Sequence, residues 1–240
     1  MVNVKNLTKW VAPVLMFVFC DFIYRQHLVQ YLLDRDYLVV NFFENSFLNK
    51  TFSFGLLNFA VAVIILLISK FIFKEKLTSI DSSDKISFKK SAIIVFLAVV
   101  VTIIIFYLLT YIIYDVLGSS VNSAAAIYIR DMYMRNKFIY VIFTFFTVTF
   151  EEVVYRKLLF GYLYDLHSGC NRYIRLITSL LGSVIIFGAI HDGVLSSGMI
   201  FYVVAGISFT IVYFYTKRIS AAIAIHFLYN ICVRLIRTII

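Results

Sequence analysis

The chain has 240 residues, of which 62% are hydrophobic and only 15% are charged, with a mean hydropathy of +0.93. Soluble domains average about 45–50% apolar and about 25% charged residues, so this composition excludes an ordinary soluble domain. Long apolar runs also argue against a membrane β-barrel, whose strands show short alternating segments. The net charge of +9 is spread over loops and helix ends. We attribute it to topology and to attraction toward the lipid bilayer, and we expect no nucleic-acid partner, because no basic run accompanies a soluble binding module.

The apolar runs predict an all-α fold, a polytopic membrane helical bundle of about seven or eight transmembrane helices in one integral membrane domain over residues 1–240. The first span is expected at 10–24 and is retained, because Asp21 interrupts its end and no small-residue cleavage site follows. Residues 25–53 mix charged and apolar side chains and are predicted to form an interfacial amphipathic helix. The remaining spans are expected at 54–73, 91–117, 137–164, 174–191, 197–215 and 219–233.

The sequence also predicts whether the segments between the spans lie in solvent or at the membrane interface. Residues 74–90 are the most polar stretch and predict a solvated loop, whereas residues 119–137 are expected at the membrane interface. Asp21 and Asp115 are also placed near interfaces. Lysine and arginine residues near the span ends modestly favour a cytoplasmic amino terminus. Together these features predict a multi-pass protein of the cell membrane, whose oligomeric state the sequence leaves open.

Two adjacent carboxylates, Glu151 and Glu152, stand inside the span at 137–164, directly after an uncharged run. An ionised carboxylate in hydrocarbon costs about 2.5–3.5 kcal/mol on insertion scales, so such a pair predicts a functional site. Glu152 and Arg156 are four residues apart, share a helix face and can form an ion pair. Glu151 points about 100° away from Glu152 and is left without that partner, so it remains available for chemistry.

Two later spans also carry polar residues at or near membrane depth. His191 lies four residues after Phe187, and His226 lies four residues before Asn230 on one helix face. Convergence on one cavity would satisfy these groups, whereas exposure to lipid would leave them unpaired. Taken singly, a histidine is often a hydrogen-bonded packing group, Asn230 an interhelical contact and Phe187 a packing residue.

The glutamates have simpler interpretations too. Glu152 with Arg156 can be a structural ion pair only, and Glu151 a structural acceptor. Breaking a buried ion pair is costly whether or not the pair takes part in chemistry, so pairing alone does not identify a catalytic role. The residues of all three spans taken together favour a site.

In chain order, three motifs resemble those of the CPBP family of intramembrane proteases: Glu151-Glu152-x-x-x-Arg156, Phe187-x-x-x-His191 and His226-x-x-x-Asn230. This family includes the type II CAAX prenyl endopeptidases and the bacterial Abi proteins linked to bacteriocin processing or immunity. The resemblance spans residues 151–230 and predicts a motif-bearing catalytic core at about 137–236, whereas residues 1–136 carry none of it.

The resemblance implies an intramembrane glutamic endopeptidase that needs no catalytic metal and no cofactor. By motif position, Glu151 would activate water with help from His191, and His226 and Asn230 would stabilise the oxyanion. Glu152 and Arg156 would shape and orient the site. A carboxylate beside a histidine suits a general base, and imidazole and amide groups suit an oxyanion site. The expected substrates are membrane-associated peptides or protein precursors.

Three alternatives stay open at this point. A zinc-dependent intramembrane protease would also use Glu and His residues, although the chain has no HExxH motif. A transporter or proton relay would likewise place carboxylates and histidines inside the membrane. A catalytically silent immunity or scaffold protein would keep the motifs without using them.

Overall fold

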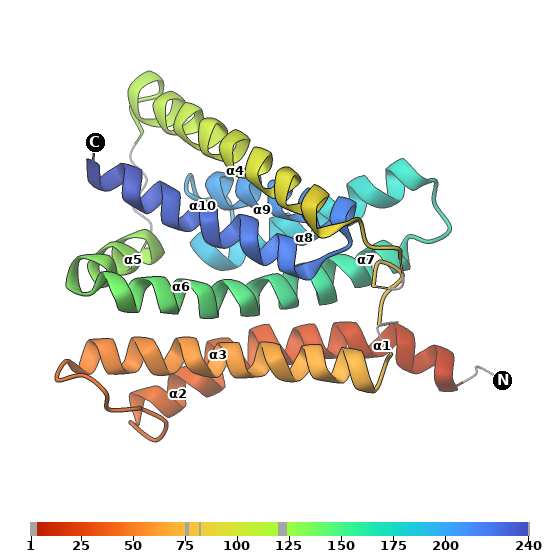
Figure 1. Cartoon of the computed structure of the whole chain (residues 1–240), viewed down its shortest axis with the longest axis horizontal. Helices are drawn as coiled ribbons and strands as arrows, with labels where there is room; N and C mark the ends of the chain where they lie inside the picture. Colours follow the sequence, from red (N-terminus) through yellow and green to blue (C-terminus); the bar gives the residue numbers. More distant parts are fainter. Residues whose placement is uncertain (1–3, 75–76, 82, 120–123, 240) are drawn as a thin grey trace.

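The computed structural model of the protein describes residues 4–74, 77–81, 83–119 and 124–239 (Figure 1). These residues form helices and no strands, which confirms the predicted all-α class. Three stretches, η1 to η3, are wider π-helical turns that continue the preceding helix without a break. The elements are α1 (Val4–Val18), η1 (Phe19–Leu28), α2 (Val29–Asp34), α3 (Ser46–Phe71), α4 (Phe88–Tyr111), η2 (Ile112–Val116), α5 (Ala124–Arg135), α6 (Lys137–Glu152), η3 (Val153–Phe160), α7 (Gly161–Leu166), α8 (Arg172–Asp192), α9 (Met199–Thr216) and α10 (Ile219–Ile239).

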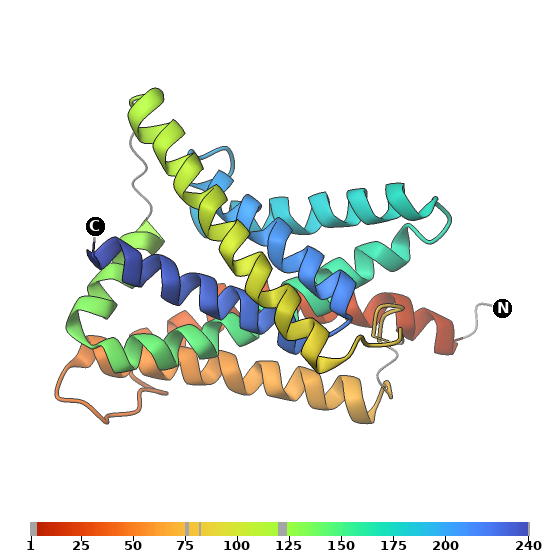
Figure 2. The same cartoon turned by 45° about the horizontal axis from the view of Figure 1, so that its top comes forward.

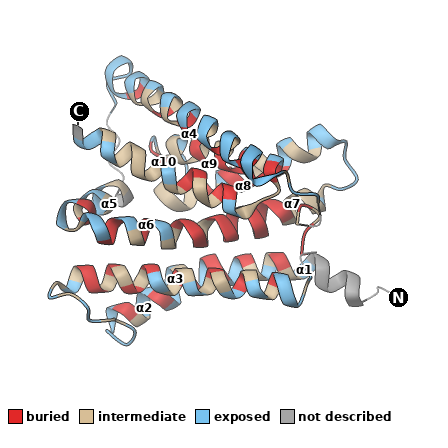
Figure 3. Ribbon diagram, viewed as in Figure 1, coloured by how far each residue is buried: buried red, intermediate tan, exposed pale blue. Residues whose placement is uncertain are grey.

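Seven helices in the described part of the chain are long and apolar enough to cross a membrane. They are Val11–Asp34, Ser46–Phe71, Phe88–Val116, Lys137–Leu166, Arg172–Asp192, Met199–Thr216 and Ile219–Thr238. The chain is therefore a multi-pass membrane protein. The outward faces agree with this, since α4 exposes many large apolar side chains (Figure 3).

The prediction for residues 25–53 was wrong. No separate interfacial helix forms there: η1 and α2 extend the first span to Asp34, a short loop follows, and α3 already begins at Ser46. Two of the charges that suggested an interface have ion-pair partners: Arg25 Nη2 lies 3.1 Å from Asp21 Oδ1, and Asp36 Oδ1 lies 3.0 Å from Lys50 Nζ. Of the loop predicted at 74–90, residues 75, 76 and 82 lie outside the described residues, as do 120–123 of the stretch 119–137.

Polar side chains fix where several spans begin. Asn45, Asn136 and Asn171 precede α3, α6 and α8, and each side-chain oxygen accepts hydrogen bonds from backbone N–H groups of the first helical turn. Such caps satisfy donors that have no partner within the helix. At the other end of α8, Gly193 has φ of 84°, a left-handed conformation that glycine adopts without strain and that ends the helix directly after Asp192.

The fourth span, built from α6, η3 and α7, lies at the centre of the bundle. It runs between α3 and α1 on one side and α10, α9 and α8 on the other (Figures 1 and 2). Its residues are the most buried of any span, and every residue from Val153 to Phe160 is buried. A charged residue buried in this span therefore needs a partner, either on the same helix or from a neighbouring helix or loop.

Candidate active site

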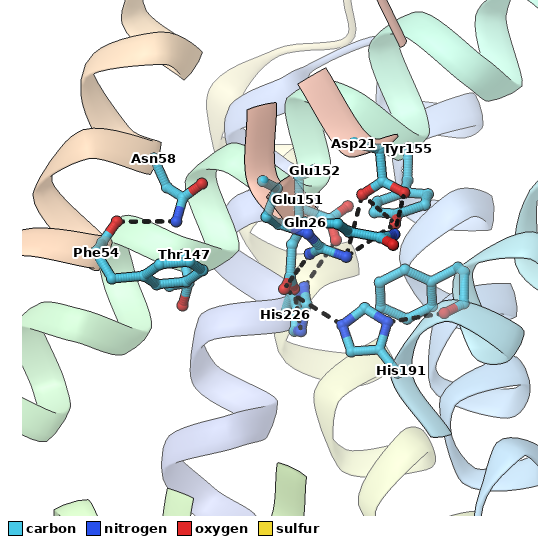
Figure 4. Close-up of polar contacts among 12 residues, drawn as sticks. Asp21, Gln26, Phe54, Asn58, Thr147, Glu151, Glu152, Tyr155, His191 and His226 are labelled. Atoms are coloured by element: carbon cyan, nitrogen blue, oxygen red, sulfur yellow. Dashed lines mark hydrogen bonds and ion pairs between the residues drawn. The ribbon is translucent and has the colours of Figure 1, made fainter. Parts of the chain in front are cut away.

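Glu151 lies near the end of α6 and faces side chains from three other helices. Its Oε1 is 3.3 Å from Nε2 of His191 on α8 and 3.4 Å from Nη1 of Arg25 on η1. Its Oε2 is 3.9 Å from Nε2 of His226 on α10. Figure 4 shows the Glu151 carboxylate between the two imidazole rings. Residues that are far apart in the sequence thus meet around one carboxylate.

Glu152 points to a different set of partners and is completely buried. Its Oε1 accepts a hydrogen bond of 2.7 Å from Nδ1 of His226, and its Oε2 lies 3.1 Å from Nε of Arg156. The ion pair expected from the four-residue spacing of Glu152 and Arg156 forms, although the helix widens into η3 directly after Glu152. His226 therefore joins the two glutamates, with Nδ1 toward Glu152 and Nε2 toward Glu151.

The hydrogen bonds of His191 fix which ring nitrogen faces the carboxylate. Nδ1 lies 2.7 Å from the carbonyl oxygen of Phe187, which can only accept, so Nδ1 carries a proton. Nε2 then faces Glu151 Oε1. The 3.3 Å distance between Nε2 and Oε1 suits a hydrogen bond whenever one of the two groups carries a proton at this position.

Aromatic rings hold the two histidines and the arginine in place. His226 stacks on Phe209 at a centroid distance of 4.3 Å, and His191 stacks on Tyr202 at 4.9 Å. The Arg156 guanidinium lies 4.4 Å from the centre of the Phe187 ring and 5.5 Å from that of Phe209. Such cation–π contacts are favourable away from water, so the rings help to accommodate this buried charge.

Arg25 and two neighbours form a polar group that the sequence analysis did not include. Nη2 of Arg25 is 3.1 Å from Oδ1 of Asp21, and the Tyr155 hydroxyl donates a 2.8 Å hydrogen bond to the same oxygen. Asp21 has no exposed surface and lies in the middle of the span Val11–Asp34, so the expectation that it ends the first span near the interface was wrong. The signal was present in the sequence, because Asp21 and Arg25 are four residues apart in an apolar run.

A cavity of about 530 Å³ gives access to these groups. Glu151, His191, His226 and Asn230 all line it, and Phe187 lies among them. The Glu151 side chain keeps 15% of its surface exposed, whereas Glu152 keeps none. Of the two carboxylates, Glu151 is therefore the one that a substrate or water molecule can reach.

The structure thus brings together every residue singled out from the sequence. Glu151, His191 and His226 are in direct contact or nearly so, Glu152 and Arg156 lie behind them, and Asn230 lines the same cavity. Within the described residues, no group of three or more His, Cys, Asp or Glu side chains has an arrangement that could hold a metal ion.

Comparison with known proteins agrees with this arrangement. Residues 134–232 match the family described as "Type II CAAX prenyl endopeptidase Rce1-like". No curated protein and no solved structure matches the chain. The matched segment includes α6, η3, α8, α9 and most of α10, the elements that carry all three sequence motifs. Over this segment the chain is similar to the Rce1-like family of CAAX-type intramembrane proteases.

Proposed function

We propose that the protein is a metal-independent intramembrane endopeptidase in which Glu151 and His191 activate water for attack on a peptide bond. The observation that carries the proposal is the position of Glu151. It is the accessible carboxylate of the cavity and lies 3.3 Å from one histidine and 3.9 Å from a second. The match to a protease family supports the same reaction class.

Glu151 and His191 carry out two proton transfers in this reaction. The Glu151 carboxylate accepts a proton from the attacking water, which places the hydroxide on the carbonyl carbon. When the C–N bond breaks, the amine needs a proton, and Glu151 or His191 Nε2–H supplies it. General acid–base steps of this kind contribute about 10²- to 10⁴-fold in rate. The Phe187 carbonyl keeps His191 Nε2 directed at the glutamate throughout.

His226 and Asn230 are the proposed donors to the tetrahedral oxyanion. Nδ1–H of His226 already donates to Glu152, so Nε2 donates to an oxyanion only when the ring carries both protons. The Asn230 amide offers a second donor from the next turn of α10. Removing one donor of an oxyanion site costs about 10²- to 10³-fold in kcat.

Glu152, Arg156 and Arg25 act on the site through other residues. Glu152 fixes the His226 ring, Arg156 balances the Glu152 charge, and Arg25 contacts the same Oε1 of Glu151 that faces His191. We regard these three as positioning residues, because Glu152 and Arg25 contact His226 and Glu151, and Arg156 contacts Glu152.

The cavity lining bears on the substrate. Aromatic side chains make up much of its wall, and Arg234 and Arg237 lie toward the carboxyl-terminal end of α10. Among the described residues of the lining, Glu151 is the only acidic one. These features favour an apolar segment of a membrane-associated peptide or protein precursor that carries a negatively charged group near one end.

The test uses purified protein and a panel of membrane-associated peptide precursors, with and without a chelator. Wild type should cleave one or more peptides equally well in both conditions, and Glu151→Ala should lose cleavage. Glu44→Ala is the matched control, since Glu44 is an exposed loop glutamate and should behave as wild type. Equal cleavage by wild type and Glu151→Ala would refute the role of Glu151.

The same experiment separates the alternatives. Loss of wild-type cleavage with chelator, and recovery on adding zinc, would favour a zinc protease. Full biological function of both Glu151→Ala and His226→Ala, without cleavage of any peptide, would support a silent immunity or scaffold protein. Flux of a substrate across the membrane without a cleavage product would favour a transporter.

A further inference from the structure

A second pocket, of about 180 Å³, lies away from the active site. It is formed where α3 ends, where the loop 77–81 packs against η3, and where α9 turns into α10. Among the described residues, four lysines line it, together with one acidic residue, Asp81: the lysines are Lys70, Lys85, Lys157 and Lys217. Lys70 and Lys217 give this lining positive charge that a bound anion would balance.

The one carboxylate of the pocket is already engaged. Asp81 Oδ1 lies 2.5 Å from Nζ of the buried Lys157 and accepts a 3.3 Å hydrogen bond from the Tyr213 hydroxyl. Asp81 therefore balances Lys157. Among the described residues of the lining, Lys70 and Lys217 have no comparable carboxylate.

Lys217 is held over the pocket by its backbone and by an aromatic ring. It ends α9 in a left-handed conformation with φ of 55°, and its Nζ lies 3.6 Å from the centre of the Phe214 ring. Partial burial, together with the nearby charges of Arg172 and Arg175, lowers the pKa of Lys217 to about 8. Cations crowded in this way favour binding of an anion.

Two polar atoms of the pocket residues are buried without a hydrogen-bond partner among the described residues. They are the Ser69 hydroxyl oxygen and Asp81 Oδ2. Buried polar atoms without partners are uncommon and call for an explanation. A phosphate oxygen would accept from the Ser69 hydroxyl, and a hydroxyl group next to that phosphate would donate to Asp81 Oδ2.

The position of the pocket distinguishes a lipid from other anions. Leu66 and Ile219 form an apolar part of its wall, and the membrane spans of α3, α9 and α10 end or begin beside it. An amphiphile at the membrane surface meets both the lysines and this apolar wall. Basic pockets between helices at a membrane surface bind lipid head groups by the same physics.

We propose that this pocket binds the phosphate head group of an anionic phospholipid with a hydroxyl-bearing head, such as phosphatidylglycerol. Its volume is below the roughly 300–1,000 Å³ of sites for drug-sized ligands, so it takes the head group while the acyl chains stay in the bilayer. Inorganic phosphate has the same phosphate oxygens but no acyl chains, so it serves as the comparison ligand. The proposal does not rest on the proteolytic function.

The loop that closes the pocket is anchored independently of a ligand. Asp165 on α7 accepts a 2.8 Å hydrogen bond from the backbone N–H of Ser79 and forms an ion pair of 3.0 Å with Arg175. Thr78 packs closely on Gly161. A Cβ atom added to Gly161 would lie 2.7 Å from the methyl carbon of Thr78. The walls are therefore in place before a lipid arrives, which lowers the entropy cost of binding.

The test measures the melting temperature of the full-length protein in neutral detergent. Three additives are compared: phosphatidylglycerol, phosphatidylcholine and inorganic phosphate. We expect phosphatidylglycerol to raise the melting temperature of wild type more than the other two. Lys217→Gln and Lys70→Gln should each lose half or more of that shift. Lys89→Gln should keep it, because Lys89 is an exposed lysine at the start of α4, outside the pocket.

Native mass spectrometry of the same samples counts retained lipid and does not depend on how a variant affects folding. Wild type and Lys89→Gln should retain phosphatidylglycerol, and Lys217→Gln should retain several-fold less. Equal retention by Lys217→Gln, Lys70→Gln and wild type would overturn the proposal. An equal melting shift from inorganic phosphate would overturn the lipid assignment and identify a free-phosphate site instead.

Discussion

Arg156 and Lys157 are neighbours on η3, and both are buried cations, but they differ in where their partners come from. Arg156 pairs with Glu152, four residues earlier on the same span, and lies against the ring of Phe187, which lines the cavity. Lys157 pairs with Asp81 in a loop 76 residues away and points toward the lysine-lined pocket. Neighbouring residues of the fourth span thus belong to two separate polar sites.

The comparison shows what local spacing can and cannot reveal. An i, i+4 pair follows from helix geometry, so Glu152–Arg156 was predictable. The partner of Lys157 depends on how a polar loop folds back against the bundle, which no local pattern specifies. The two pairs also differ in surroundings, since Glu152 has no exposed side-chain surface and Asp81 keeps 7%.

Replacement of Arg156 should have the largest effect. Arg156→Met leaves Glu152 buried without its cation, and breaking a buried pair costs about 3–5 kcal/mol of unfolding free energy. Cleavage should also fall to background, because Glu152 holds His226. Thermal melting and peptide cleavage measure the two effects. The double variant Glu152→Gln/Arg156→Met should recover part of the stability but not the cleavage, and recovery of both would contradict the positioning role.

Lys157→Met should destabilise the protein at or below the lower end of the same range, about 3 kcal/mol, because Asp81 keeps its Tyr213 hydrogen bond. The kcat of the folded fraction should stay within about threefold of wild type, since Lys157 touches no residue of the active site. Melting curves and active-site-normalised rates test this. A loss of kcat as deep as that of Arg156→Met would show that the two sites are not separate.

Arg25→Gln should lower kcat by about tenfold with little change in KM, since one charge-assisted hydrogen bond to Glu151 is lost at 3.4 Å. Arg25→Lys should restore part of the rate because it keeps the charge. Steady-state kinetics on the best peptide substrate distinguish the outcomes. An increase in KM alone would mean that Arg25 binds the substrate instead.

The smallest effect concerns pH at the lysine pocket. Lys217, with its pKa lowered to about 8, loses its charge as pH rises from about 7 to about 9. Because a bound phosphate favours the charged lysine, affinity for phosphatidylglycerol should fall by up to about tenfold per pH unit over this window. The charged and titratable groups around Lys217 are Arg172, Arg175, Lys70, Asp81, Lys85, Lys157 and Tyr213. Lipid retention measured across this range should change for wild type and stay flat for Lys217→Gln, and a flat wild-type profile would exclude Lys217 as the titrating group.

Much of the helical scaffold followed from the sequence, because long apolar runs are a strong signal and their ends carry Asn or Ser caps. The expected spans agree with the structure to within a few residues from α4 onward. The first span extends to Asp34 and α3 begins at Ser46, beyond the expected bounds 10–24 and 54–73, because charged residues such as Arg25 and Lys50 lie within these helices. They have partners that only the folded protein reveals.

The predicted catalytic core at 137–236 stays a prediction, but the structure adds the first span to its surroundings. Glu151 was expected to have no cation of its own, and Arg25 supplies one from 126 positions away in the chain. The partner of His226 was likewise hidden, because a ring that contacts Glu152 through Nδ1 and approaches Glu151 through Nε2 is a product of helix packing. Motif spacing identified the residues but not their hydrogen bonds.

Cleavage by Glu151→Gln, measured beside wild type in the presence of chelator, tests the central claim most directly. Gln keeps the size and most contacts of Glu151 but cannot accept a proton from water. The expected result is a fall in kcat of about 10²- to 10⁴-fold for the variant, with an unchanged melting temperature and no effect of chelator on wild type. A variant that cleaves at the wild-type rate, or a wild type that needs a metal, would contradict the account.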